Sequence, residues 1–136
     1  MPEAEKNAEK MELRVLPDRL AVARLPHDAP WPTPAHHTGF ASITRTDAEL
    51  SVVCAEDDVP AGATTIERGW NALEVVGPLD FSMIGVMSAL TKPLADVGVS
   101  VFVVSTFDTD YVLVHASALE TAVHALRQAG HAVHAG

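Results

Sequence analysis

The sequence is poor in cysteine and has no long apolar run. Its 136 residues include one cysteine, Cys54, so no internal disulfide can form, and this favours a protein of the reducing cytoplasm. No apolar run approaches the roughly 18 residues of a membrane-spanning helix. Residues 1–10 also lack the apolar core of a secretory signal. We therefore expect a cytoplasmic protein in which residues 1–10 form a short disordered extension.

Positive charge is scarce as well. Nine Lys and Arg residues stand against 18 Asp and Glu residues, which gives a formal net charge of -9. An acidic surface repels phosphate backbones and anionic lipids, so neither nucleic acid nor a membrane is expected as a partner. Hydrophobic residues make up 48% of the chain. That share is enough for a packed core in one typical domain or two very small ones.

Motifs of catalysis and metal binding are missing. The sequence has no Gly-x-Ser-x-Gly elbow, no phosphate-binding loop and no His-Glu-x-x-His motif. Cys54 ends the apolar run 50–54, which is typical of a small buried hydrophobe and not of a nucleophile. The seven histidines lack the grouping that zinc requires and are expected at the surface. We predict no catalytic residue, no metal site and no cofactor.

The second half of the chain has the clearest secondary-structure pattern. Residues 70–77 predict a strand, and residues 82–97 predict a helix kinked near Pro93. The runs 99–104 and 110–115 are joined by too few residues for a crossover and predict an antiparallel hairpin. The first of these runs is nearly all apolar, which favours a strand that is covered on both faces or central in its sheet.

A second helix and a last strand complete this pattern. Ser117 and Glu120 have the spacing of a capping box, which predicts a helix with Leu119, Val123 and Leu126 facing inward. Residues 131–134 predict an edge strand. The order strand, helix, strand, strand, helix, strand predicts an α+β fold of the βαββαβ type, an antiparallel sheet with its helices on one face.

The first half of the chain is predicted to form two β-hairpins. Residues 13–16 and 20–25 flank a turn and predict the first, and residues 39–44 and 50–55 predict the second. Residues 26–34 hold four prolines, so a loop is expected there. The segment between the halves is short, so we expect the halves to pack together.

Residues 79–114 resemble a characteristic segment of ACT domains. The run 105–114 (STFDTDYVLV) matches a strand–turn–strand signature of stand-alone bacterial ACT proteins, and residues 92–100 match as well, including the proline. The chain is similar to tandem-ACT proteins related to the arginine sensor of the animal TOR pathway and, more loosely, to the regulatory ACT domains of aspartate kinases. The resemblance implies two ferredoxin-like ACT subdomains, residues 11–64 and 65–136, packed together.

The resemblance also implies an amino-acid ligand held at an interface between ACT units, in a homodimer. Two turns are the candidate site. The first contains Ser82, Met83, Ile84 and Gly85, where a helix start offers free amides to a carboxylate. The second contains Thr106, Phe107, Asp108, Thr109 and Asp110, where a carboxylate can accept from an ammonium group. The same residue types are also ordinary turn formers.

Ser82 and Met83 bear on which ligand fits. In the ligand-binding half of the arginine sensor, the matching positions carry an acidic pair, so their replacement here favours a smaller or apolar amino acid over a guanidinium. The sequence thus predicts an amino-acid-binding regulatory or sensor protein that is not an enzyme. Two alternatives stay open. One is a ligand-free structural or interaction module that dimerises, and the other is a detached regulatory subunit of an enzyme of amino-acid metabolism.

Overall fold

A computed structural model describes residues 10–33, 39–77 and 84–135. Residues 1–9 of the expected extension lie outside this range. No helix in the described ranges is long and apolar enough to cross a membrane. The described residues form β1 (Glu12–Val15), β2 (Leu20–Leu25), β3 (Ser42–Arg45), β4 (Leu50–Ala55), η1 (Glu56–Asp58), β5 (Thr65–Val75), α1 (Val86–Asp96), β6 (Phe102–Ser105), β7 (Asp110–His115), η2 (Ala116–Ala118), α2 (Leu119–Gln128) and β8 (Ala132–His134).

Contacts divide the chain into two compact units. The C-terminal unit comprises residues 1–17 and 71–136, and the N-terminal unit comprises residues 18–70. This division differs from a split after residue 64, because β1 belongs with the C-terminal half of the chain. The long strand β5 contributes to both units, its first part to the N-terminal unit and its second part to the C-terminal unit.

The C-terminal unit has the strand order β8-β1-β5-β7-β6. The predicted order of elements is confirmed, since β5, α1, β6, β7, α2 and β8 follow one another in the βαββαβ pattern. The hairpin of β6 and β7 is antiparallel as expected. The insertion of β1 was not predicted. It runs antiparallel to β5, with Leu13 opposite Val75, and parallel to β8, with Leu13 opposite Val133.

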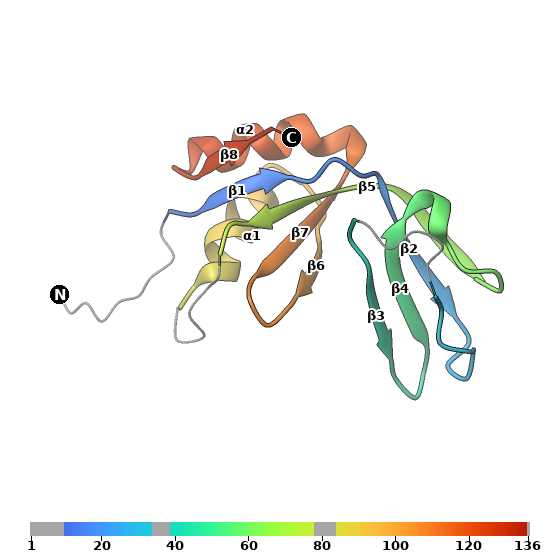
Figure 1. Ribbon diagram of the computed structural model, residues 1–136. Coiled ribbons are helices and arrows are strands. Elements are labelled where there is room, and N and C mark those ends of the chain that lie inside the picture. Colours follow the sequence, from blue (N-terminus) through green and yellow to red (C-terminus); the bar gives the residue numbers. More distant parts are fainter. Residues whose placement is uncertain (1–9, 34–38, 78–83, 136) are drawn as a thin grey trace. The chain divides into compact units, whose positions relative to one another are not determined.

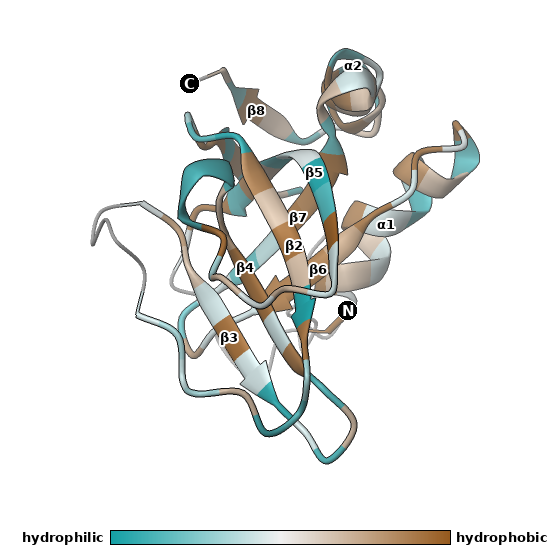
Figure 2. Cartoon of the chain, turned by 90° about the vertical axis from the view of Figure 1, so that its right-hand side faces the viewer, coloured by the Kyte–Doolittle hydropathy of each residue, from teal (hydrophilic) through white to brown (hydrophobic). Residues whose placement is uncertain are grey.

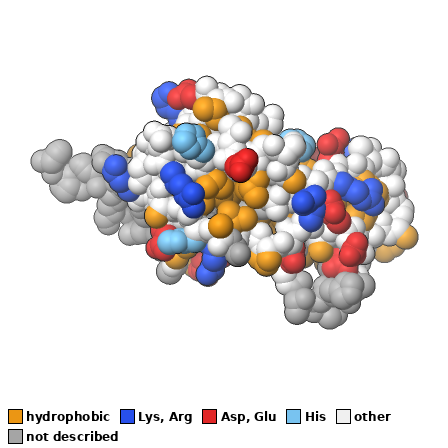
Figure 3. Space-filling model, turned by 90° about the horizontal axis from the view of Figure 1, so that it is seen from above, with side chains coloured by type: hydrophobic (Ala, Val, Ile, Leu, Met, Phe, Trp, Pro, Cys, Tyr) orange, Lys and Arg blue, Asp and Glu red, His pale blue; other side chains and the backbone are white. Residues whose placement is uncertain are grey.

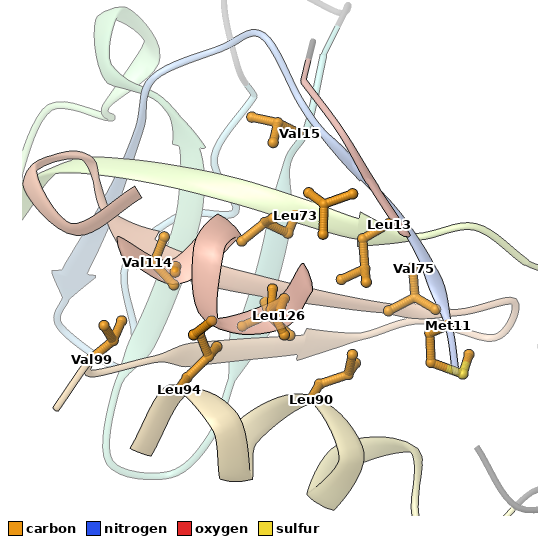
Figure 4. Close-up of a cluster of buried hydrophobic side chains, with 14 residues drawn as sticks. Met11, Leu13, Val15, Leu73, Val75, Leu90, Leu94, Val99, Val114 and Leu126 are labelled. Atoms are coloured by element: carbon orange, nitrogen blue, oxygen red, sulfur yellow. The ribbon is translucent and has the colours of Figure 1, made fainter. Parts of the chain in front are cut away.

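Both helices of this unit cover one face of its sheet. Leu90 and Leu94 of α1 and Leu126 of α2 are buried in one cluster with alternate strand residues. Figure 4 shows these side chains pointing toward Leu73 and Val75 of β5. Because the side chains of a strand alternate between its two faces, one face supplies the core on which the helices pack.

The helix ends depart from the predictions in two places. α1 begins at Val86, after Gly85, and it contains Pro93 as expected. The capping box at Ser117 is wrong, because residues 116–118 form the 3-10 turn η2 and no side chain caps α2. The inward face of α2 is confirmed, since Leu126 is buried and Leu119 and Val123 pack against the core.

The expectation that residues 99–104 form a strand covered on both faces or central in its sheet is also wrong. The strand β6 begins only at Phe102 and pairs with β7 alone in the described part of the chain. Val103 is 37% exposed. The apolar run belongs to an edge strand with one partly exposed face. The prediction failed because the pattern of apolar residues does not report how many neighbouring strands a strand has.

The N-terminal unit has the strand order β3-β4-β2-β5. The hairpin of β3 and β4 is confirmed, with Arg45 opposite Leu50. The first predicted hairpin is wrong, because β1 and β2 do not pair with each other. β2 pairs with the first part of β5, and β1 pairs with the second part of the same strand. The turn at residues 17–19 therefore joins two strands that pair with successive segments of β5.

A β-bulge marks the position in β5 where it pairs with the start of β2. Leu20 lies opposite Trp70, but Val22 lies opposite Glu67, so β5 has one extra residue in this interval. Gly69 takes a φ of +83°, which is a conformation that glycine adopts without steric cost. Its N–H donates to the carboxylate of Glu56 at 2.7 Å.

The core of the N-terminal unit is small and built mainly from β2 and β4. It contains Leu25, Leu50, Val52 and Cys54, with Ile43 of β3 packed against it. In Figure 2, β3 carries one hydrophobic band between polar ends. Cys54 is 1% exposed, as expected for a buried hydrophobe. Burial, and secondarily the negative charge of Asp58, raise the pKa of its thiol. The described residues of this unit include no α-helix, so the full βαββαβ pattern is seen in the C-terminal unit.

Candidate functional site

The first candidate turn leads into α1. Ser82 and Met83 lie outside the described residues, Ile84 is 64% exposed, and Gly85 is the residue before the helix, with a φ of +80°. The described first turn of α1 has no side-chain cap and no acidic residue. The Ser88 hydroxyl donates to the Gly85 carbonyl oxygen at 3.2 Å. The first N–H groups of α1 lie at the positive end of the helix dipole. No carboxylate side chain within that turn accepts a hydrogen bond from them.

The second candidate turn joins β6 to β7 and is closed by its two threonines. The Thr106 N–H donates to the Thr109 carbonyl oxygen at 2.8 Å. The Thr106 hydroxyl lies 3.1 Å from the same oxygen, and it accepts from the Thr109 N–H at 3.3 Å. Thr109 is buried. The Thr106 hydroxyl therefore serves the turn itself, and the Thr109 hydroxyl donates to the carbonyl oxygen of Val75 in β5, which leaves Asp108 and Asp110 as the polar side chains of the turn for a ligand.

A hydrogen bond joins this second turn to the strand that precedes the first. The Thr109 hydroxyl donates to the carbonyl oxygen of Val75 at 2.7 Å. Val75 is the last residue of β5, and the chain runs from there to Gly85 and α1. Both turns thus belong to the end of the sheet at which β5 finishes (Figure 1).

The side chains of the second turn differ in exposure. Phe107 is 80% exposed, and Asp108 is exposed beside it. Asp110, the first residue of β7, is half-buried and lies opposite Ser105 in the hairpin. The turn therefore presents carboxylates beside an apolar ring, which can contact a ligand that has an ammonium group and an apolar side chain.

A polar triad that sequence reasoning missed lies on the sheet face away from the helices. Arg14 of β1 donates to Glu74 of β5 at 2.6 Å, and the Tyr111 hydroxyl of β7 donates to the other oxygen of Glu74 at 3.2 Å. Partial burial and then the negative charge of Glu74 raise the pKa of Tyr111. The hydrogen bond to Glu74 raises the pKa of Arg14. The triad links the three central strands of the unit.

One histidine overturns the expectation of surface histidines. His131 is 5% exposed. Its Nδ1 accepts from the Met11 N–H at 2.9 Å, and its Nε2 lies 2.9 Å from the Ala89 carbonyl oxygen. His36 and His37 lie outside the described residues. Within the described ranges, no group of three or more His, Cys, Asp or Glu residues is placed to hold a metal ion.

The charges of the surface are mixed in sign. In the face shown in Figure 3, acidic and basic side chains are interspersed. That face has no broad basic patch of the kind that tracks a phosphate backbone, and the net charge of the chain is -9.

Two family models match the chain. The model of the ACT domain matches residues 65–128, and a model of an N-terminal domain matches residues 18–62. The second match falls within the N-terminal unit. The chain is an ACT-domain protein, with α+β architecture and a ferredoxin-like C-terminal unit.

The Agrobacterium tumefaciens protein Atu0741, known from a crystal structure, is similar to this chain over nearly its whole length. It is 37% identical to this chain, and the similarity covers 95% of this chain and 96% of that one, with a TM-score of 0.86. The human protein CASTOR3P is 31% identical over 99 residues, which cover 64% of this chain and 61% of that protein. The chain thus spans less than two thirds of the human relative's length.

A regulatory subunit shares the fold at lower identity. The ligand-free regulatory subunit of aspartate kinase from Thermus thermophilus is 12% identical, with a TM-score of 0.59 over 87% of this chain and 96% of that one. Such a likeness concerns the fold alone. The neighbour is a regulatory chain and not a catalytic one.

Proposed function

We propose that this protein is a cytoplasmic regulatory or sensor protein that binds a small or apolar amino acid and catalyses no reaction. The turns at Ile84–Gly85 and at residues 106–110 hold the ligand at an interface between ACT units. The observation that carries the proposal is the Thr109 hydrogen bond to Val75, which attaches the acidic turn to the strand leading to the uncapped start of α1.

The chemistry of an amino acid suits these two turns. Its α-carboxylate accepts from the first amides of α1, which have no side-chain cap and no acidic neighbour in that turn. Its ammonium group donates to Asp108 or Asp110. Gly85 has no side chain to obstruct the approach, and the exposed side chains of Ile84 and Phe107 offer apolar contact to the ligand's own side chain.

The protein acts as a homodimer in this proposal. The strand β6 is a sheet edge among the described residues, and Val103 and Phe107 on and beside it are exposed. Open edges and exposed apolar side chains are features that a second chain can cover. Sedimentation at rising protein concentration should show a dimer, and a monomer at every concentration would contradict this part of the proposal.

A second candidate function follows from the regulatory subunit of aspartate kinase, which is a chain of similar length. The protein would then be the detached regulatory subunit of an enzyme of amino-acid metabolism. Stable co-elution with a catalytic chain that lacks its own ACT domain would favour this candidate. A free dimer that responds to an amino acid would favour the first.

Thermal unfolding in the presence of each of the twenty amino acids tests the proposal. A ligand at 100 times its Kd stabilises the folded state by about 2.7 kcal/mol, which raises Tm by roughly 8 °C for a chain of this size. Asp108→Asn combined with Asp110→Asn should abolish the shift, because the ammonium group then loses both candidate charged acceptors. Asp96→Asn, an exposed carboxylate on α1, should retain it. A flat response to all twenty amino acids would favour a ligand-free module.

A further inference from the structure

A separate pocket lies within the N-terminal unit. Its volume is about 470 Å³, within the range of small-molecule sites. Two loops form its walls, residues 26–32 after β2 and residues 60–62 before β5, and Leu25 of β2 lies between them. All of its lining residues belong to the unit 18–70, whereas the two candidate turns belong to the other unit.

The first loop is held rigid by one arginine and by its prolines. Arg45 of β3 donates to the carbonyl oxygens of His27 and Ala29, the latter at 2.8 Å. Its guanidinium also lies 5.7 Å from the ring centroid of Trp31. The Ala29 N–H donates back to the Pro26 carbonyl oxygen at 3.0 Å, and prolines fix φ at three positions of the loop. A wall fixed before binding loses little entropy when a ligand arrives.

The described residues of the lining include one aromatic ring and one charged side chain. Trp31 is 59% exposed, and most of the other lining residues are prolines and alanines. Asp28 is the charged residue among those that line the pocket. Arg45 is not a lining residue, and two of its donors are occupied by the loop carbonyls. The N-terminal unit has four arginines against eight Asp and Glu residues, so its formal charge is negative.

We propose that this pocket binds a small organic cation, an amine carried on an apolar or aromatic body. The apolar body packs against Trp31 and the proline walls, and the ammonium group pairs with Asp28. An anion of the same shape is disfavoured, because Asp28 is the charged residue among the described residues that line the pocket, and the Arg45 guanidinium behind Trp31 is engaged by the loop carbonyls. The site is independent of the two turns in the C-terminal unit, so the protein has a second place at which a metabolite can bind.

Titration of the full chain with phenethylamine and with 3-phenylpropionate tests the proposal. The two probes share a phenyl ring and a two-carbon linker but carry opposite charges. The indole N–H signal of Trp31 in an NMR spectrum, identified by its loss in Trp31→Phe, reports occupancy. At low salt the amine should bind on the order of tenfold more tightly than the acid, since Asp28 attracts one and repels the other.

Three variants make the outcome decisive. Asp28→Asn should bring the two affinities within about twofold of each other, whereas Asp57→Asn, an exposed carboxylate of the same unit that does not line the pocket, should leave the preference intact. Ala61→Phe should fill the pocket and abolish the response of Trp31. Equal affinities in the unmodified chain, a preference for the acid, or an unmoved Trp31 signal would each overturn the proposal.

Discussion

Shortening Leu94 to alanine is expected to lower the free energy of unfolding by about 2–5 kcal/mol. Leu94 is 0% exposed and packs in the core between α1 and the sheet of the C-terminal unit. The substitution removes buried apolar surface and leaves a cavity that the surrounding strands cannot close, because packed interiors relax only in part. Urea unfolding followed by circular dichroism measures the loss.

Lys92→Ala is the matched control for that measurement. Lys92 lies on the same helix, and its ammonium group is 3.0 Å from Asp96 in an exposed pair. Exposed pairs contribute little, so this change should cost less than about 1 kcal/mol. If both substitutions had equally small effects, the helix would not pack on the sheet as described.

Replacing His131 with alanine should lower the free energy of unfolding by about 2–4 kcal/mol, because one buried and one partly buried backbone group lose their partners. One is the Met11 N–H, which donates to Nδ1. The other is the Ala89 carbonyl oxygen, which lies 2.9 Å from Nε2. In a regular helix that oxygen would accept from the residue four positions later, but this residue is Pro93, which has no N–H. The histidine replaces the hydrogen bond that the proline removes.

A double-mutant cycle separates this role from loss of packing. Pro93→Ala supplies the missing N–H, so His131→Ala should cost about 1 kcal/mol less in that background than in the unmodified chain. His134→Ala, three residues further along the chain at the end of β8, is the control. Its ring is more than half exposed and pairs with Glu12, so its loss should cost less than about 1 kcal/mol. Additive costs for Pro93 and His131 would contradict the assignment.

The parts of the fold that are local in sequence could be predicted. The spacing of Leu90 and Leu94 locates α1, and the short connection between the runs 99–104 and 110–115 predicts the antiparallel hairpin seen between β6 and β7. The place of β1 could not be predicted, because it pairs with residues 58 to 62 positions away in β5 and 120 positions away in β8. A strand pattern identifies a strand but not its neighbours. The same ambiguity led to the wrong hairpin between β1 and β2.

The candidate site could likewise be predicted only where its residues are close together in the sequence. The turn of residues 106–110 was predicted from its residue types, and Gly85 from its place at the start of the helix predicted over 82–97, which in the structure begins at Val86. Two interactions were out of reach of any local pattern, namely the contact of His131 with α1 and the clamp of Arg45 on Trp31. The sequence holds one signal for the pocket of the N-terminal unit. Residues 26–34 contain four prolines and are not expected in a sheet, so Trp31 among them has few ways to become buried.

Backbone amide shifts on ligand addition test the central claim most directly. With the amino acid that raises Tm most, the largest changes in the ¹H–¹⁵N spectrum should fall on Gly85, on the first amides of α1 and on residues 106–110. These positions should move together with a single Kd. Changes confined to other parts of the chain, for example to the loops at 26–32 and 60–62, would contradict an amino-acid site built from these two turns.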